Sequence, residues 1–304
     1  MSAPTSEGYI PFSVPAAGKP CQTYYKIYGD LKSGVTPVIT LHGGPGAPHH
    51  YMTPFVDLVS GYGIPVVFYD QIGCGGSTRL PEKMGATEFW TVGLFEDEFR
   101  NLISHLGIEE YDILGHSWGA MLAMAMAIKQ IKGLRRMVLM SGAASMSLWD
   151  KATRMLVKTL PQEAQDALTI NEENGTYDTP EYKKATGEFM QRFVCRMETW
   201  PEELVLAFKL LEEEPAAYFT MQGPSEFTLT GNFKTFELVS ELHKIKIPTL
   251  LLNGAYDEAQ DMVLEPAFRE IPKVKWFTFA KSAHVAQWEE REKCMEIVGA
   301  FLSQ

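Results

Sequence analysis

Long apolar runs are missing from this sequence. No stretch approaches the ~20 consecutive apolar residues that span a bilayer. The polar first residues, with Pro4, Pro11 and Pro15, lack the apolar segment of a secretory signal peptide. Internal repeats and low-complexity tracts are absent too. These absences argue against membrane-spanning and repeat architectures, and we expect a cytoplasmic protein.

Cysteine is also scarce, and its spacing is irregular. The four cysteines are scattered along the chain, at Cys21, Cys74, Cys195 and Cys294. Zinc sites and disulfide frameworks show paired or regular spacing instead. We therefore expect four reduced thiols that pack as small buried side chains, and neither a metal nor another cofactor.

Positive charge is in short supply. Lys and Arg number 27 against 38 Asp and Glu, which gives a net charge of −11. Nucleic acids and anionic membranes both require clustered basic residues, so we expect neither as a partner. The acidic run Glu212-Glu213-Glu214 is typical of a solvated helix end, although it also suits a cationic substrate. In both cases it raises the local concentration of substrates that carry an ammonium group.

The chain does have size and a clear alternation of patterns. Its 304 residues, 45% of them hydrophobic, suffice for a substantial core. Strand-like and helix-like segments alternate up to about residue 141 and again from residue 249. This predicts an α/β fold with a mostly parallel sheet and helices on both faces. The expected strands are 23–28, 37–41, 66–69, 111–114, 137–140, 249–252 and 275–279, and the expected helices are 53–60, 96–106, 118–130, 262–270 and 291–302.

The segment between these two halves has a different pattern. Strand signals vanish, and amphipathic helical stretches appear at 147–160, 182–195 and 202–213. We therefore expect a core domain made of residues 1–141 and 242–304, with a helical cap, residues 142–241, inserted as a lid.

The most informative motif is Gly115-His116-Ser117-Trp118-Gly119, which reads G-x-S-x-G between an apolar strand and an apolar helix. The glycines permit a tight strand-to-helix turn that pushes the serine hydroxyl out of the sheet. Ser117 is therefore a candidate nucleophile. The alternative is an ordinary turn.

A carboxylate and a base follow in the order that such a nucleophile needs. A serine must pass its proton to a histidine, which a carboxylate orients, and in this sheet architecture the chain order is Ser, Asp or Glu, His. Asp257 lies just after the expected strand 249–252, and His284 follows the expected strand 275–279. Because the carboxyl ends of parallel strands meet at one sheet edge, we expect all three residues to lie there.

A glycine-rich segment supplies the remaining part of such a site. His42-Gly43-Gly44-Pro45-Gly46 follows the expected strand 37–41. Attack on a carbonyl builds negative charge that N–H donors must stabilise. We expect the peptide N–H groups of Gly44 and Trp118 to be these donors. His42 is interpreted as structural, and a plain turn is the alternative for the whole segment.

With these motifs the chain resembles the proline iminopeptidase family of serine aminopeptidases, peptidase family S33, within the α/β-hydrolase fold. The resemblance rests on four segments, 42–46, 70–77 (Asp-Gln-Ile-Gly-Cys-Gly-Gly-Ser), 115–119 and 223–231 (Gly-Pro-Ser-Glu-Phe-Thr-Leu-Thr-Gly). It implies an enzyme that removes an N-terminal residue, often proline, from small peptides, amides or arylamides.

The resemblance also implies substrate contacts. In the family a cap glutamate, here Glu226, binds the free α-amino group of the substrate, and Glu198 is the position matched to a second glutamate with the same role. Gly43 is assigned to substrate binding as well. Two departures bear on specificity, because His116 stands where the family usually has Gly and the residues 281–288 around His284 are less typical.

Aromatic residues are frequent in the expected cap. Trp200, Tyr218, Phe219 and Phe227 either wall an apolar pocket for the first residue of the substrate or form the core of the cap.

The sequence thus predicts a metal-free serine aminopeptidase that acts on a small peptide or amino-acid amide with a free N-terminus. One alternative is an amidase, esterase or lactonase that acts on a small metabolite in a biosynthetic pathway. Another is a non-catalytic ligand-binding protein that has retained the fold. The oligomeric state stays open.

Overall fold

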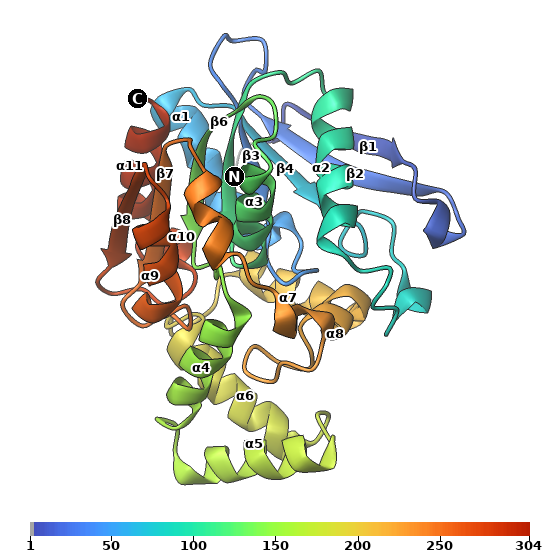
Figure 1. Ribbon diagram of the computed structural model, residues 1–304, viewed down its shortest axis with the longest axis vertical. Helices are drawn as coiled ribbons and strands as arrows, with labels where there is room; N and C mark the ends of the chain where they lie inside the picture. Colours follow the sequence, from blue (N-terminus) through green and yellow to red (C-terminus); the bar gives the residue numbers. More distant parts are fainter. Residues whose placement is uncertain (1–2) are drawn as a thin grey trace.

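The computed structural model describes residues 3–304 and is built around one eight-stranded sheet (Figure 1). The strand order is β1-β2-β4-β3-β5-β6-β7-β8. β3 to β8 pair in parallel, whereas β1 with β2 and β2 with β4 are antiparallel. The strands are β1 (Ser6–Phe12), β2 (Cys21–Tyr28), β3 (Val38–Leu41), β4 (Val66–Asp70), β5 (Tyr111–His116), β6 (Leu134–Met140), β7 (Thr249–Gly254) and β8 (Val274–Phe279). The predicted α/β-hydrolase sheet is confirmed.

β1 is the one strand that the sequence analysis does not predict. It lies at the edge of the sheet and buries only Ile10 and Phe12, so its pattern is too short to stand out. Pro11 lies within it, which an edge strand tolerates because one side of its backbone needs no partner. A 3₁₀ turn, Pro15–Ala17, follows it, and the chain then returns as β2.

Helices cover both faces of the sheet. α2 (Val92–His105), α3 (Trp118–Ile128) and α9 (Asp261–Glu270) pack on one face, against side chains such as Ile39, Ile113 and Leu251. The 3₁₀ segment His49–Val56, α1 (Asp57–Tyr62) and α11 (Arg291–Leu302) pack on the other face. The strands buried on both sides are therefore almost entirely apolar, as parallel strands with two covered faces must be.

The chain between β6 and β7 forms a helical cap at one end of the sheet, at the bottom of Figure 1. Its helices are α4 (Met146–Val157), α5 (Gln162–Asn174), α6 (Pro180–Phe193), α7 (Glu202–Glu213) and α8 (Ala216–Met221). α5 and α8 are not among the predicted helices. α5 buries only Ala164, Leu168 and Asn171, which leaves little apolar periodicity, and α8 is a short helix.

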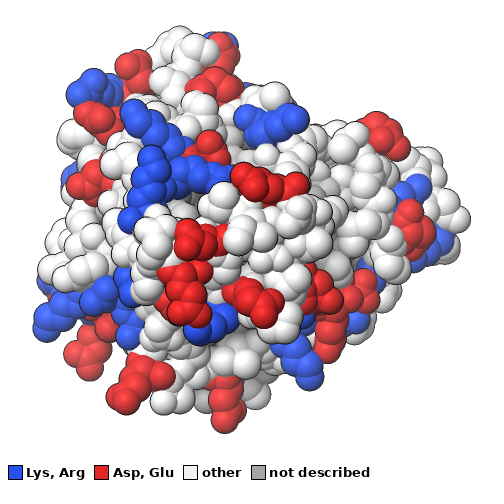
Figure 2. All heavy atoms as spheres, turned by 90° about the horizontal axis from the view of Figure 1, so that it is seen from below, with Lys and Arg blue, Asp and Glu red and all other residues white. Residues whose placement is uncertain are grey.

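The cap has a small core of its own and an acidic surface. Leu160, Leu168, Tyr182, Phe189 and Phe227 pack together inside it. Residues 142–241 carry seventeen Asp and Glu against nine Lys and Arg. Figure 2, which views the molecule from the cap end, shows acidic side chains gathered over the middle of this face. The cap therefore holds most of the negative charge in excess.

The structure bears on two expectations that rest on composition, one about the cysteines and one about membrane-spanning helices. All four cysteine thiols are free and buried, as the sequence analysis predicts. None of the helices in the described part of the chain combines the length and the apolar composition needed to cross a membrane.

The tightest packing in the fold surrounds the turn between β5 and α3. Ser117 occupies this turn with φ 54° and ψ −121°, a backbone conformation that L-residues rarely adopt. A Cβ on Gly119 would lie 2.0 Å from the carbonyl oxygen of Leu41, and a Cβ on Gly115 would lie 2.4 Å from that of Gly119. Both glycines are required because backbone atoms occupy the space that any side chain needs.

Gly119→Ala should therefore lower the free energy of unfolding by about 1 to 3 kcal/mol, since the β3 backbone must move to admit the methyl group. Urea denaturation followed by circular dichroism measures this change. Gly61→Ala in α1 is the matched control, because nothing lies within 4 Å of its Cβ position. Equal stability of the two variants would contradict the packing argument.

Candidate active site

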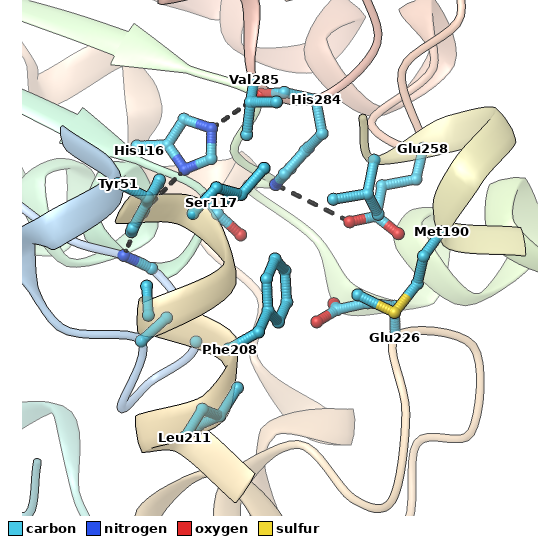
Figure 3. A pocket seen from close by; sticks show the side chains of 16 residues that line it. Tyr51, His116, Ser117, Met190, Phe208, Leu211, Glu226, Glu258, His284 and Val285 are labelled. Atoms are coloured by element: carbon cyan, nitrogen blue, oxygen red, sulfur yellow. Dashed lines mark hydrogen bonds and ion pairs between the residues drawn. The ribbon is translucent and has the colours of Figure 1, made fainter. Parts of the chain in front are cut away.

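Ser117 lies at the floor of a small pocket between the sheet edge and the cap (Figure 3). The pocket has a volume of about 40 Å³, and Ser117 is partly exposed within it. Its polar lining comes from Tyr51, His116, Ser117, Glu226, Glu258 and His284, and its apolar lining from Ala47, Met190, Val194, Leu204, Ala207, Phe208, Leu211 and Val285. The strained turn thus presents the Ser117 hydroxyl to an enclosed and largely apolar space.

Asp257 and His284 meet beside this pocket. Asp257 lies in the turn after β7, and its Oδ1 is 2.7 Å from Nδ1 of His284. The carboxylate also accepts hydrogen bonds from the Ala259 N–H at 2.8 Å and the Ser141 hydroxyl at 2.6 Å. These partners fix the buried carboxylate, which in turn orients the imidazole. Since Nδ1 donates to Asp257, Nε2 of His284 is left to accept a proton.

Ser117 and His284 line the same pocket without a direct hydrogen bond between them in the described residues. Nε2 of His284 lies 3.7 Å from Oε1 of Glu258 instead. Catalytic hydrogen bonds are often long in a free enzyme and shorten when substrate binds. The structure therefore brings Ser117, Asp257 and His284 together at the sheet edge where the sequence analysis expects them, with His284 facing a second carboxyl group.

Acidic side chains hold the loop that carries His284. Oε2 of Glu289 accepts the Ala283 N–H at 2.6 Å, and Oε2 of Glu290 accepts the Lys281 N–H at 2.8 Å. The His284 N–H donates to the Val194 carbonyl at 3.0 Å, which ties the loop to the end of α6. The atypical residues around His284 thus build a loop with many fixed backbone groups. No pattern in the sequence indicates these contacts.

The two expected oxyanion donors are Gly44, which lines the pocket with Ser117, and Trp118, which follows Ser117 in the chain. Gly44 has φ +106°, and a Cβ there would lie 2.5 Å from the N atom of Gly46, so only glycine fits. The Trp118 N–H is in the first turn of α3, where helical N–H groups have no intrahelical acceptor. Among residues 3–304 neither N–H has an acceptor. Both therefore remain available for a developing negative charge.

Gly43, which the sequence analysis assigns to substrate binding, has a backbone N–H that is already bonded. It lines the pocket, but its N–H donates to the hydroxyl of Tyr51 at 2.7 Å. Its Cβ position lies 3.0 Å from the Ser117 Cβ, so glycine leaves room for the nucleophile. The structure thus brings Gly43 to the site as a close neighbour of Ser117, with its N–H already engaged.

His42 and Gln71 support the glycine-rich loop from below. The Gln71 N–H donates to Nε2 of His42 at 2.9 Å, and the Gln71 side-chain amide donates to the His42 carbonyl at 3.0 Å. Nε1 of Trp118 donates to Oε1 of Gln71 at 2.7 Å. These buried bonds link the loop to the start of α3, in line with the structural role expected for His42.

Glu226 enters the pocket from the cap. Its Oε1 accepts a hydrogen bond from the Tyr218 hydroxyl at 2.7 Å. The Glu226 carbonyl accepts one from Nε1 of Trp149 at 2.9 Å, which fixes the backbone. Burial raises the pKa of the Glu226 carboxyl above its usual range, against the opposing effects of Tyr218 and His284.

The structure does not bring Glu198 to this pocket. Glu198 is exposed in the link between α6 and α7 and does not line the pocket. Glu258 lines the pocket instead, buried beside Asp257, and its Oε2 has no hydrogen-bond partner among the described residues. Burial, together with the nearby Glu226 and Asp257, raises the pKa of Glu258 well above its usual range. The adjacent pair Asp-Glu after a buried strand was the signal in the sequence.

A larger cavity adjoins the pocket within the cap. It has a volume of about 470 Å³ and shares Met190, Phe208, Leu211 and Glu226 with the pocket. The cap aromatics discussed above line this outer cavity and not the inner pocket, at Trp200, Tyr218, Phe219 and Phe227. Glu226 therefore stands at the boundary between a small compartment that holds Ser117 and a wide apolar one.

Comparison with known proteins places this site in a family. A family model described as alpha/beta hydrolase fold matches residues 36–291. The proline iminopeptidase of Clostridium botulinum is 34% identical over 300 residues, which cover 98% of each chain. That of Saccharolobus solfataricus is 35% identical over 282 residues, which cover 92% of this chain and 89% of its own.

Solved structures agree over nearly the full length. The crystal structure of VinJ matches with a TM-score of 0.94 and 39% identity, covering 98% of both chains. The crystal structure of the proline iminopeptidase of Mycobacterium smegmatis matches with a TM-score of 0.88 and 35% identity, covering 98% of this chain and 97% of that one. The chain is accordingly an enzyme, a hydrolase that belongs to the proline iminopeptidase family of the α/β-hydrolase fold.

Proposed function

We propose that this enzyme is a serine aminopeptidase, which releases the first residue of a small peptide or amide that carries a free amino group. One observation supports this above all. Ser117 shares a small pocket with His284 and with two carboxyl groups, Glu226 and Glu258, whose pKa values are raised. A nucleophile next to a cation site suits a substrate whose ammonium lies close to its scissile carbonyl.

The chemistry follows from the roles available to each group. Ser117 Oγ attacks the carbonyl carbon of the first residue, and its proton passes to Nε2 of His284. Asp257 stabilises the imidazolium, and the N–H groups of Gly44 and Trp118 bind the oxyanion. Collapse of this intermediate breaks the C–N bond, and the leaving amine takes the proton from His284. Water then attacks the acyl-enzyme by the same route and frees the amino acid.

Glu226 and Glu258 restrict this chemistry to the first residue. Two carboxylates in one buried site repel each other and lose hydration, so a cation between them relieves both costs. The substrate ammonium is that cation. A residue further along a peptide has an amide nitrogen instead of an ammonium, and it therefore gains nothing from this site. Glu258 takes the role that the resemblance assigns to Glu198.

The first residue of the substrate is small or is proline. The inner pocket is bounded by short apolar side chains, among them Ala47, Ala207 and Val285. Three of the four similar proteins named above are proline iminopeptidases, and the compact, apolar ring of proline suits such a lining. Longer side chains would collide with Phe208 and Leu211, which separate the pocket from the outer cavity.

The outer cavity favours a second candidate, an amidase acting on the amide of a larger metabolite. This cavity has an aromatic lining, and its volume of about 470 Å³ is far larger than a single amino acid requires. Apolar surface of this kind binds apolar groups, since burial contributes about 25 cal/mol per Å² of apolar area. A leaving amine that is bulky and apolar would fill it. The two candidates share one mechanism and differ only in the leaving group.

Ser117→Ala should lower kcat by roughly 10⁴ to 10⁶, because binding and oxyanion stabilisation alone remain. Steady-state turnover of proline arylamide measures this loss, with circular dichroism as the check on folding. A fluorophosphonate should label the wild-type protein at Ser117 and leave the variant unlabelled. Full activity in the variant would rule out the mechanism.

Glu226→Gln and Glu258→Gln should each lower kcat/KM on free-amine arylamides by roughly 30-fold to several thousand-fold, the cost of removing one partner of a buried charge pair. The same variants should change little on N-blocked arylamides or simple esters, which have no ammonium. A series of leaving amines of increasing apolar size separates a peptide from a larger metabolite amide.

Glu198→Gln provides the comparison that decides between the two glutamate assignments. Its side chain is exposed outside the pocket, so its kcat/KM should equal that of the wild type on every substrate. A loss confined to Glu198→Gln would restore the sequence-based assignment. Equal losses of the pocket variants on free and blocked substrates would mean that these carboxyls only support the cap.

Glu258→Gln should also change how stability depends on pH. The folded pKa of Glu258 is raised, so its contribution to stability is complete below the unfolded value near 4.3 and is lost as pH rises through the folded pKa. Gln does not titrate. Above about pH 4.3, the free energy of unfolding of the variant should therefore rise relative to that of the wild type, by up to about 1.4 kcal/mol per pH unit. Urea denaturation from pH 5 to 9 tests this, and parallel curves would contradict it.

A further inference from the structure

A short chain of buried hydrogen bonds runs beneath Ser117 (Figure 3). Nε2 of His116 lies 2.7 Å from the carbonyl oxygen of His284, and Nδ1 of His116 lies 2.9 Å from the hydroxyl of Tyr51. The same hydroxyl receives the Gly43 N–H at 2.7 Å. His116 and Tyr51 are almost fully buried. The chain therefore joins the loop of the base to the oxyanion loop behind the nucleophile.

The direction of every bond in this chain is fixed by its two ends. A carbonyl oxygen only accepts, so His116 carries its proton on Nε2 and donates to His284. Nδ1 of His116 must then accept the Tyr51 O–H, and the Tyr51 oxygen accepts the Gly43 N–H. Burial lowers the pKa of His116 to about 3, so this neutral tautomer persists throughout the pH range of a working enzyme.

Packing adds to these bonds. The rings of His116 and His284 meet edge to face, with centroids 4.6 Å apart, and those of Tyr51 and His116 do the same at 5.2 Å. Trp288 lies in the short helix α10 (Ala286–Glu289) that follows His284, and its Nε1 donates to the Tyr51 carbonyl at 2.8 Å, which ties Tyr51 to this part of the chain a second time. Rings held by contacts on both sides have few alternative rotamers.

We propose that His116 is a positioning residue, which through Tyr51 holds the loop of the catalytic base and the oxyanion loop at a fixed separation around Ser117. This inference rests on the proposed function, because it assigns His284 and the Gly43-Gly44 segment to the reaction. In this role His116 acts through the His284 carbonyl and the Tyr51 hydroxyl, although its side chain also lines the pocket. It sets where the imidazole and the oxyanion donors stand relative to each other.

The consequence is specific to the transition state. The oxyanion donors and the base must both lie within a few tenths of an ångström of their working positions, and a displacement of about 1 Å costs roughly 100-fold in rate. The proposed substrate contacts are Glu226, Glu258 and the apolar lining. Tyr51 and His116 also line the pocket, but their polar atoms are engaged within this chain of bonds. Loss of the chain should therefore lower kcat and leave KM nearly unchanged.

The experiment compares Tyr51→Phe, His116→Phe and the double variant on a free-amine arylamide. Each single variant should lower kcat by roughly 10- to 100-fold, with KM within about 3-fold of the wild type. The double variant should be no slower than the slower single variant, because either change breaks the same chain. The rate of fluorophosphonate labelling at Ser117 should fall in parallel with kcat.

Two further variants separate positioning from general structure. His116→Gln can keep a donor near the Nε2 position, so it should retain more kcat than His116→Phe. Tyr111→Phe is the matched control, because Tyr111 in β5 is a buried tyrosine like Tyr51. Its hydroxyl donates to the Lys132 carbonyl at 3.0 Å, away from the site. It should lose stability without losing kcat.

The outcomes distinguish this inference from the proposed function. If the wild type hydrolyses free-amine substrates through Ser117 but folded Tyr51→Phe keeps full kcat, the positioning role is wrong and the aminopeptidase assignment stands. Additive losses in the double variant, or losses in KM alone, would also overturn it. If the wild type fails on free-amine substrates, the proposed function is what fails. Should His116→Phe not fold, Tyr51→Phe and His116→Gln still carry the test.

Discussion

The turn at Ser117 imposes a steric constraint on which the rest of the site depends. Backbone atoms of β3, β5 and α3 crowd around it so closely that Gly115 and Gly119 have no room for a methyl group. The strained φ of Ser117 is retained because these neighbours leave no alternative. Ser141, at the end of β6, has the same sign of φ, and its hydroxyl bonds to Asp257. Strain at two adjacent strand ends thus places the nucleophile and the carboxylate.

The pocket contains two carboxyl groups, Glu226 and Glu258, in addition to the constrained Ser117. Glu226 comes from the cap and Glu258 from the core, so both parts of the chain contribute a carboxyl group to the pocket. Burial raises the pKa of both carboxyls, which disfavours their ionised forms. The acidic face of the cap in Figure 2 has a separate, longer-range effect, since it draws cations toward the cap end of the molecule.

Much of the fold and part of the site follow from sequence patterns. Buried parallel strands give unbroken apolar runs, and residues just after them lie at one sheet edge, so Ser117, Asp257 and His284 could be placed together. Edge strand β1 could not be predicted, because it buries too few residues to leave a pattern. The position of Glu198 outside the pocket could not be predicted for another reason: a residue in a short link between helices has no periodicity, and its direction is set by tertiary packing.

The links between distant residues were beyond sequence reasoning altogether. Tyr51, His116 and His284 are separated by tens to hundreds of positions, and nothing local marks them as neighbours. His116 appeared only as a departure from the usual residue of the family. Glu289 and Glu290 read as ordinary charges near a helix start, although they bond to backbone N–H groups of the His284 loop. Such contacts arise from the fold as a whole.

Asp257 and Glu258 are consecutive residues in one turn, and this adjacency has a consequence for substrate length. One carboxyl faces the ring of His284 and the other faces the pocket. Under the proposed function, the carboxyl that orients the base and one carboxyl that binds the substrate ammonium therefore come from a single turn. The separation of the Cα atoms of two consecutive residues is fixed by covalent geometry. Under the proposed function, Glu226 from the cap and Glu258 from the core share the substrate ammonium, and only Glu258 is joined through the backbone to the residue that orients the base, so the spacing between amine and carbonyl depends mainly on the core.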